Sequence, residues 1–340
     1  NTKILSKYSQ HLILTEKEFT ALLVKLQKTK SFTIDLETNS LNYMQAKIVA
    51  LVFLIDKDSY YIPVAHDYLG APKQLDKEQV LKDLKNILEN KQIGKIGQNI
   101  KYDCHVLANE GINLQGIVED TMLKSYCLNS VATRHNINNL AEFYLNYKTL
   151  KFEDIAGKGK QALEFNKIEI ESAMPYACED VIITKELNDC LENKIKKAVN
   201  LYHIYKDIEL PLVEVILKIE RNGTLINPSA LYIQQEQIQE KMQNIKEKAF
   251  LIAGNEFNMD SPKQIQEILF GEDGLGLEVK KQTAKGQPST NEEALKLLDH
   301  PLVDLIMSYR LLAKIDSTYL NTLPKQIDNN TKRLHTSYHQ

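Results

Sequence analysis

Cysteine is scarce in this sequence, and no long apolar run occurs. The chain of 340 residues has four cysteines, none of them in a CxxC spacing: Cys104, Cys127, Cys178 and Cys190. Four are too few for a stapled secreted scaffold and are not spaced as zinc ligands, so we expect reduced thiols packed as small buried hydrophobes. No stretch approaches the roughly 18 apolar residues of a membrane span, and the N-terminus lacks the pattern of a secretory signal. These absences predict a cytoplasmic protein with no membrane segment.

An excess of positive charge is also absent. Lysine and arginine number 42 against 45 aspartates and glutamates, which gives a formal net charge of -3 at pH 7. This balance argues against a protein that coats nucleic acid through bulk positive charge, although it is compatible with local basic surfaces. An enzyme that gathers carboxylates around metal ions is acidic overall even when its substrate is a polyanion. The sequence also lacks a P-loop, a GxSxG motif and a zinc-binding Cys/His spacing.

The pattern of residues 1–195 predicts an α/β domain with one central sheet. Apolar residues at helical spacing indicate helices over residues 15–26 and 79–88, and Thr15 with Glu18 forms a capping-box pattern at the start of the first. Alternating or unbroken apolar runs predict four strands, the second and third of them paired: 31–35, 48–54, 60–64 and 93–97. From there to about residue 195 the pattern is mainly helical, and strands mixed with helices are typical of an α/β fold.

Residues 196–340 predict a second, mostly helical domain. Strand signals fade after residue 195, and residues 229–253 form a long helical stretch rich in Gln, Glu and Lys. A chain of 340 residues suits two domains, because single domains cluster near 100 to 200 residues. With 43% hydrophobic and 26% charged residues, the composition is that of an ordinary soluble globular protein.

The first candidate for chemistry is a pair of carboxylates on a predicted strand. Asp35 and Glu37 are two residues apart, so a strand places both side chains on the same face of the sheet. Two neighbouring carboxylates repel each other unless a cation joins them. Taken alone, an Asp-x-Glu pair is more often two solvated acids at a strand end, so the pair becomes specific only with partners.

Two further acids have suggestive positions. Asp103 follows Gly97 at a predicted turn from strand to helix, where a ligand commonly binds; alone it would be an acid at a helix N-terminus. Asp180 lies four residues after Tyr176, so on a helix the phenol and the carboxylate share one face. Alone, that pair would be a packed tyrosine beside a surface acid.

In chain order the acids form a specific pattern: Asp-x-Glu on a first strand, Asp at a later turn, and Tyr-x-x-x-Asp on a later helix. This pattern resembles the DEDD exonuclease superfamily, in the branch with tyrosine four residues before the last aspartate. The resemblance implies a ribonuclease H-like fold and catalytic residues Asp35, Glu37, Asp103, Tyr176 and Asp180.

The same resemblance implies two bound divalent cations. Phosphodiester cleavage of this kind uses two ions about 4 Å apart, and hard oxygen ligands select Mg²⁺ or Mn²⁺. By resemblance, Asp35 bridges both ions, Glu37 and Asp180 complete the site of the ion that activates water, and Asp103 holds the second ion. Tyr176 and Glu37 orient the nucleophilic water, and the product is a dNMP.

Histidine is a weaker candidate for the catalytic base. His105 is close to Asp103 in the sequence, but we expect it to point elsewhere on its helix. The other histidines considered for this role are scattered along the chain: His11, His66, His135, His203 and His300.

Further motifs resemble the bacterial polymerase I family of DNA polymerases (family A). The exonuclease domain of that family is matched by the stretches 120–126, 128–130 with 134–135, and 152–160. The start of its polymerase domain, with the helical thumb, is matched by stretches 219–223, 261–265, 288–290 and 309–314.

The resemblance limits the expected activity. Residues 333–340 look like the opening of the motif that leads into the palm, and the palm and fingers would follow residue 340. We also expect no 5′-nuclease domain before residue 1. We therefore expect a 3′→5′ proofreading exonuclease, of a parent enzyme that acts in DNA replication and repair, without polymerase activity in this piece.

DNA contacts are also implied by the resemblance. A single-stranded 3′ end would pass Leu41, Asn99 and Tyr102 on its way to the metals. A primer-template duplex would be gripped at its phosphates by basic residues of the thumb: Lys263, Lys280, Lys281, Lys285, Arg310 and Lys314. We expect a monomer associated with the nucleoid. The alternatives are a catalytically inactive DNA-binding module of the same fold, and an RNA-processing DEDD exonuclease, which the thumb-like segment disfavours.

Overall fold

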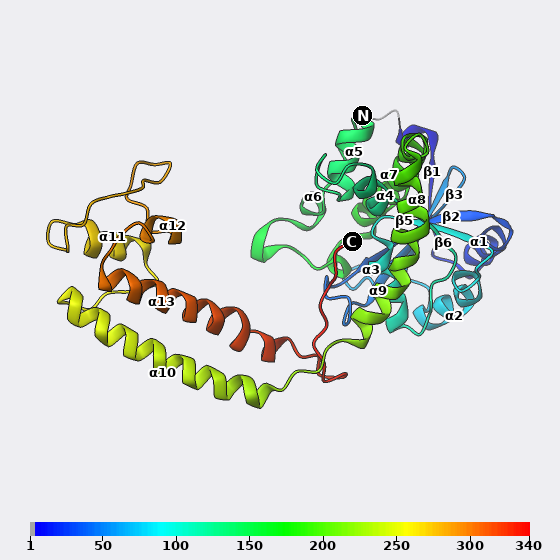
Figure 1. Cartoon of the computed structure of the whole chain (residues 1–340). Helices are drawn as coiled ribbons and strands as arrows, with labels where there is room; N and C mark the ends of the chain where they lie inside the picture. Colours follow the sequence, from blue (N-terminus) through cyan, green and yellow to red (C-terminus); the bar gives the residue numbers. More distant parts are fainter. Residues whose placement is uncertain (1–3) are drawn as a thin grey trace. The chain divides into compact units, whose positions relative to one another are not determined.

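The computed structural model describes residues 4–340, apart from the side chain of Lys160, and it contains two compact units (Figure 1). The first unit comprises the described residues up to Arg221 together with Ser337–Gln340. The second unit is Asn222–Thr336. Among residues 4–340, no helix combines the length and apolar character that a membrane span requires.

A mixed sheet forms the centre of the first unit. Its six strands lie in the order β1-β4-β3-β2-β5-β6, where β2, β3 and β4 are antiparallel neighbours and the other three strands run parallel to theirs. The strands are β1 (Ser9–Leu12), β2 (Ser31–Thr38), β3 (Ile48–Ile55), β4 (Asp58–Pro63), β5 (Gly94–Gly97) and β6 (Ile117–Asp120). The predicted α/β architecture with one central sheet is confirmed, and the sheet is mixed.

Helices cover both faces of this sheet. One core contains Ile34 and Leu36 of β2 with residues of α1, α2 and α3, and the other contains Val52 of β3 with residues of α7. The helices of the first unit are α1 (Glu16–Lys28), α2 (Lys77–Leu88), α3 (Ile100–Asn109), α4 (Thr121–Leu128), α5 (Ile137–Leu145), α6 (Phe152–Ala156), α7 (Ile170–Ile195), α8 (Val199–His203) and α9 (Leu210–Asn222). Because side chains alternate along a strand, the odd-numbered residues of β2 face α7.

Most predicted elements are present, with shifted ends. The capping box is confirmed, because Thr15 Oγ1 accepts the backbone N–H of Glu18 at 3.3 Å and the Glu18 carboxylate accepts the N–H of Thr15 at 3.1 Å. Strand β2 continues to Thr38, three residues beyond the predicted end, so Glu37 lies within it. Strands β1 and β6 were not predicted, because each is four residues long and lacks an apolar run.

The segment after α7 packs against the first unit. Tyr205, in a π-helical stretch (Ile204–Glu209), is completely buried, and its hydroxyl donates to Glu119 at 2.8 Å and accepts the N–H of Asp120 at 2.9 Å. Compactness therefore places residues up to 221 with the sheet. The predicted boundary between residues 195 and 196 separates the two domains that the family resemblance implies, not the two compact units. It stays a prediction.

The second unit is helical, as the sequence predicted. Helices α10 (Pro228–Ala253) and α13 (Pro301–Ile315) lie side by side, and α11 (Pro262–Phe270) and α12 (Glu292–Leu295) gather at one end of the pair (Figure 1). Buried residues including Leu269, Leu302 and Ile306 form its core.

A buried lysine ties α4 to α7 and to the end of β6. Lys124 is inaccessible to solvent, and its Nζ lies 2.6 Å from both Glu119 Oε2 and Glu192 Oε2 and donates to Asn188 Oδ1 at 2.7 Å. The exposed Lys196 also pairs with Glu192, at 2.9 Å. The two lysines thus share a partner but differ in burial.

We predict that the substitution Lys124→Met lowers the free energy of unfolding by about 3 kcal/mol, because it removes the buried cation shared by Glu119 and Glu192 and leaves them only their second ion-pair partners, Lys206 and Lys196. Lys196→Met should cost less than about 0.5 kcal/mol, because an exposed pair is weak. Urea unfolding followed by circular dichroism measures both. Equal losses in the two variants would contradict this account.

Candidate metal centre

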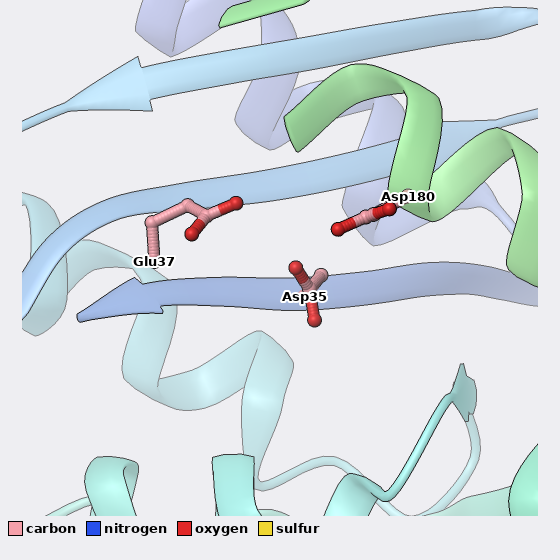
Figure 2. Close-up of side chains that lie close together, drawn as sticks. All are labelled: Asp35, Glu37 and Asp180. Carbon is pink, nitrogen blue, oxygen red and sulfur yellow. The ribbon is translucent and has the colours of Figure 1, made fainter. Parts of the chain in front are cut away.

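Three carboxylates converge between the sheet and α7. One ligand oxygen from each of Asp35, Glu37 and Asp180 lies within 4.8 Å of the others. Figure 2 shows Asp35 and Glu37 rising from β2 toward the helix that carries Asp180. The structure therefore brings together three of the four predicted acids.

Local geometry explains this convergence. The period of two along β2 points Asp35 and Glu37 to the α7 face, while Ile34 and Leu36 point into the opposite core. The register between β2 and β3 shifts at Glu37/Thr38, and such irregularities commonly re-aim side chains next to functional sites. Helix α7 packs against strands β1 to β5, which fixes Asp180 above the sheet.

Burial raises the pKa of each acid in the cluster, and the charges of neighbouring acids raise the pKa of Glu37 and Asp180 further. Burial raises the pKa of Asp35 to about 7, partly offset by the backbone N–H of Leu36. The pKa of Glu37 is raised well above its usual range by burial and then by the charges of Asp35, Asp180 and Asp103. Burial, followed by Asp35, also raises the pKa of Asp180.

The cluster has the donor set of a divalent cation site. Among the described residues, Glu37 Oε1 and Asp180 Oδ1 are buried side-chain oxygens with no hydrogen-bond partner. Buried oxygens without a donor are costly, and a cation would satisfy them and offset the repulsion. Oxygen-only ligands of this kind suit Mg²⁺ or Mn²⁺, so the residues present fit the predicted ions.

The fourth acid lies close by but outside the tight group. Asp103, in the first turn of α3, is 2% exposed. Burial raises its pKa well above the usual range, with Asp35 as the next cause, and the Leu36 N–H lowers it. The charge of Asp35 therefore influences Asp103, although Asp103 is not part of the group of three oxygens.

Asp120 fixes the helix that carries Asp103, a feature the sequence reasoning did not anticipate. Its buried carboxylate accepts the backbone N–H groups of Ile100 at 2.9 Å and Met122 at 2.8 Å, and those of Asn99 and Leu123 at 3.2 Å. One side chain thus caps both α3 and α4. The signal in the sequence was an aspartate directly before a helix. This position predicts that Asp120 caps the helix that follows it, but not that it also caps α3.

Tyr176 borders the cluster from α7. Its hydroxyl interacts with the carboxylate of Asp180 one turn later and lowers the pKa of that acid. Burial and the charges of Asp180, Glu37 and Asp35 hold the pKa of Tyr176 far above its usual value. The side chain is therefore a neutral phenol that donates a hydrogen bond.

The predicted single-strand contacts lie in the loop after β2 and at the start of α3. The Tyr102 hydroxyl donates to the backbone oxygen of Ser40 at 2.6 Å and lies 2.7 Å from Thr38 Oγ1, which holds the loop after β2. Leu41 in that loop is 92% exposed. Asn99 precedes α3 with a left-handed φ of 57° and lines a cavity of about 350 Å³ with Tyr126 and His135. Their DNA contacts stay predictions.

The predicted basic residues of the second unit differ in their surroundings. Lys280 and Lys281 pair with Glu278 at 2.5 Å and Glu293 at 2.8 Å, and Lys263 lies 3.9 Å from Glu267. Lys285 and Lys314 are exposed, whereas Arg310 is half-buried and donates to the Thr290 backbone oxygen. The DNA contacts of these six residues stay predictions.

The histidine expectation is confirmed for His105. Its Nε2 lies 2.6 Å from Glu220 Oε2, and its ring packs 4.0 Å from that of Tyr43. The side chain belongs to a buried ion cluster on α3 and takes no part in the group formed by Asp35, Glu37 and Asp180. The cysteine thiols are free, with Cys104 and Cys178 buried and the other two half-buried.

The mixed sheet with its buried carboxylates is that of a ribonuclease H-like exonuclease. Residues 10–196 match the family described as 3′-5′ exonuclease, and residues 229–340 match DNA polymerase family A. The chain belongs to the 3′-5′ exonuclease family found in family A DNA polymerases. Its exonuclease domain is followed by the start of a family A polymerase region.

Bacterial relatives agree with this assignment. The chain is 45% identical over 345 residues to DNA polymerase I of Pseudomonas aeruginosa, a match that covers 100% of the chain and 38% of the relative. DNA polymerase I of Synechocystis is 34% identical, with 97% of the chain and 34% of the relative covered. The chain thus spans little more than a third of the length of these relatives.

A solved structure has the same fold. The POL domain of Pol1 from M. smegmatis, in complex with DNA primer-template and dNTP, aligns with a TM-score of 0.76 at 21% identity. The alignment covers 97% of the chain and 52% of that structure. At this identity the likeness shows the fold alone.

We predict that Asp35→Asn stabilises the metal-free protein at pH 8. A carboxyl whose pKa rises on folding, from 3.8 to about 7, binds more protons folded than unfolded in that window, so its contribution to stability falls as the pH rises. Removing the charge should raise the unfolding free energy in EDTA by about 1 to 3 kcal/mol at pH 8, with a smaller gain at pH 5.

Thermal unfolding in EDTA at the two pH values measures this difference. Asp67→Asn is the matched control, because Asp67 is 78% exposed and pairs only at the surface with Lys167. With Mg²⁺ present, the order of wild type and Asp35→Asn should reverse. A less stable Asp35→Asn variant in EDTA at pH 8 would contradict the assignment.

Proposed function

We propose that this chain is a metal-dependent 3′→5′ exonuclease that removes nucleotides from DNA 3′ ends. The observation that carries the proposal is the group of Asp35, Glu37 and Asp180, whose carboxylate oxygens converge inside a 3′-5′ exonuclease family domain; one buried oxygen each of Glu37 and Asp180 has no donor. Asp103 and Tyr176 interact electrostatically with acids of this group, which supports their inclusion in the proposed site.

The acids would hold two Mg²⁺ or Mn²⁺ ions. Asp35 is the strongest charged neighbour of each of the other three acids, so it would be shared by the two ions, with Glu37 and Asp180 completing one site and Asp103 the other. Bound ions would supply positive charge to the attacking and leaving oxygens of the phosphodiester.

The reaction is hydrolysis of the terminal phosphodiester bond. A water oxygen attacks the phosphorus, the bond from phosphorus to the 3′ oxygen of the preceding nucleotide breaks, and that oxygen takes up a proton. The products are a dNMP and a strand shortened by one nucleotide. Glu37 would accept a hydrogen bond from the attacking water, and the neutral phenol of Tyr176 would orient it, because Tyr176 does not ionise in this acidic surrounding.

The DNA end would reach the acids beside the loop after β2. Leu41 is exposed there for contact with a base, and Tyr102 holds the loop in place. We assign residues 1–195 to the exonuclease and residues 196–340 to the polymerase region, a boundary supported by the family match that ends at residue 196.

The second unit would bind a primer-template duplex. The bound DNA in the structure of the M. smegmatis relative supports this proposal, and Lys285 and Lys314 are the exposed candidates for phosphate contacts. Because the relatives are DNA polymerase I of bacteria, we place the substrate in the bacterial cytoplasm, with the replicating or repaired chromosome.

Degradation of a 5′-labelled single-stranded DNA tests the proposal. We expect stepwise shortening from the 3′ end with Mg²⁺ or Mn²⁺, no shortening with EDTA, and a loss of at least about 1,000-fold in the Asp35→Ala, Glu37→Ala double variant. Asp67→Ala should behave as wild type, because that acid is exposed and far from the cluster in the sequence.

Two results would overturn the proposal. DNA binding without cleavage in every lane would identify an inactive binding module. Faster cleavage of an RNA of the same sequence would identify an RNA-processing enzyme, because a DNA enzyme makes no use of the 2′-hydroxyl.

A further inference from the structure

A second acid, outside the metal centre, grips the helix that carries Asp103. Glu220, near the end of α9, has a side chain with no exposed surface. Its Oε1 lies 2.6 Å from Lys101 Nζ and accepts the Tyr338 backbone N–H at 2.6 Å, and its Oε2 lies 2.6 Å from His105 Nε2. Because a carboxylate only accepts, the lysine, the amide and the imidazole N–H are all donors.

The two partners on α3 define one face of that helix. Lys101 and His105 are four residues apart and therefore neighbours, whereas Asp103 lies midway between them and projects to the other side. The next residue of α9 reinforces the grip, because Arg221 donates to the His105 backbone oxygen at 3.1 Å and to Asn109 Oδ1 at 3.0 Å. Helix α9 thus holds α3 from behind while Asp103 faces Asp35.

We propose that Glu220 is a positioning residue for Asp103. Asp120 fixes the start of α3 along its axis, and Glu220 fixes its rotation about that axis, so the two acids together determine where the Asp103 carboxylate points. The proposal rests on the metal-dependent exonuclease proposed above. Glu220 falls between the two matched family regions, 10–196 and 229–340, so neither match includes it.

The consequence is specific to one of the two ions. Asp103 is the acid assigned to the second ion, away from Glu37 and Asp180. A rotation of α3 would move Asp103 but would leave Asp35, Glu37 and Asp180 on β2 and α7 undisturbed. Loss of a residue that supports a metal ligand typically costs about 10- to 100-fold in metal affinity or activity.

The test compares Glu220→Gln with Glu214→Gln in the full chain. Glu214 is on the same helix, but it is 57% exposed and pairs with Lys218 at the surface. We expect Glu220→Gln to lower kcat on single-stranded DNA about 10- to 100-fold, with KM changed less than about threefold, and to weaken one of two bound Mn²⁺ ions about tenfold in a titration followed by electron paramagnetic resonance. Glu214→Gln should match wild type in all three quantities.

A double variant separates positioning from general damage. Combined with Asp103→Asn, Glu220→Gln should add little further loss, because both act through one carboxylate. Additive losses, or wild-type kcat and Mn²⁺ binding in Glu220→Gln, would overturn the proposal. If wild type binds Mn²⁺ but cleaves nothing, the proposed function fails, and the Mn²⁺ titration still decides the role of Glu220.

A milder variant tests the proposal if Glu220→Gln does not fold. Circular dichroism shows whether Glu220→Gln is folded; if it is not, Arg221→Gln removes the bonds to His105 and Asn109 and leaves the buried acid in place. We expect about a threefold to tenfold weaker second Mn²⁺ site in that variant. Wild-type Mn²⁺ binding in a folded Arg221→Gln would then count against the proposal.

Discussion

Carboxylates that share a buried space lose their hydration and repel one another, and Asp35, Glu37 and Asp180 do both. Asp120 in the same unit shows how a protein normally meets this cost, because its buried carboxylate accepts four backbone N–H groups. Glu37 Oε1 and Asp180 Oδ1 have no such donors. The contrast separates a structural acid, satisfied by its own fold, from acids that a cation would satisfy.

The rest of the first unit serves to keep these acids together. Strand β2 holds Asp35 and Glu37 through ladders with β3 and β5, and α7, which carries Asp180, packs against five strands. Asp103 has no strand of its own and depends on a ten-residue helix, α3. This helix is fixed by Asp120 at its start and by Glu220 on its rear face. The site is thus as rigid as the elements that converge on it. Electrostatic catalysis requires such rigidity, because the charges must be held in place before the reaction.

Local patterns in the sequence were enough to predict much of the fold. The apolar runs gave β2, β3, β4 and β5 because central strands bury nearly every side chain, as β3 does. The period of a strand placed Asp35 and Glu37 on one face, and the period of a helix placed Tyr176 beside Asp180. Strands β1 and β6 were missed because they are short strands at the sheet edges, with only one fully buried residue between them and therefore no apolar run.

Contacts between distant residues could not be predicted. The partners of Glu220 on α3 are 119 and 115 residues away, and those of Lys124 on α7 are 64 and 68 residues away. Such pairs have no local spacing, so only the packed fold reveals them. The pairing of Lys280 and Lys281 with acids of their own unit is of the same kind, since a basic stretch in the sequence does not show which charges are already neutralised.

The most direct measurement is anomalous X-ray scattering from crystals of the protein soaked in Mn²⁺ with a short single-stranded DNA. The account predicts an anomalous peak among the carboxylates of Asp35, Glu37 and Asp180, and a second peak between Asp35 and Asp103 next to the 3′ end of the strand. Crystals with DNA bound but no peak at these acids would contradict the claim that their burial is balanced by metal ions.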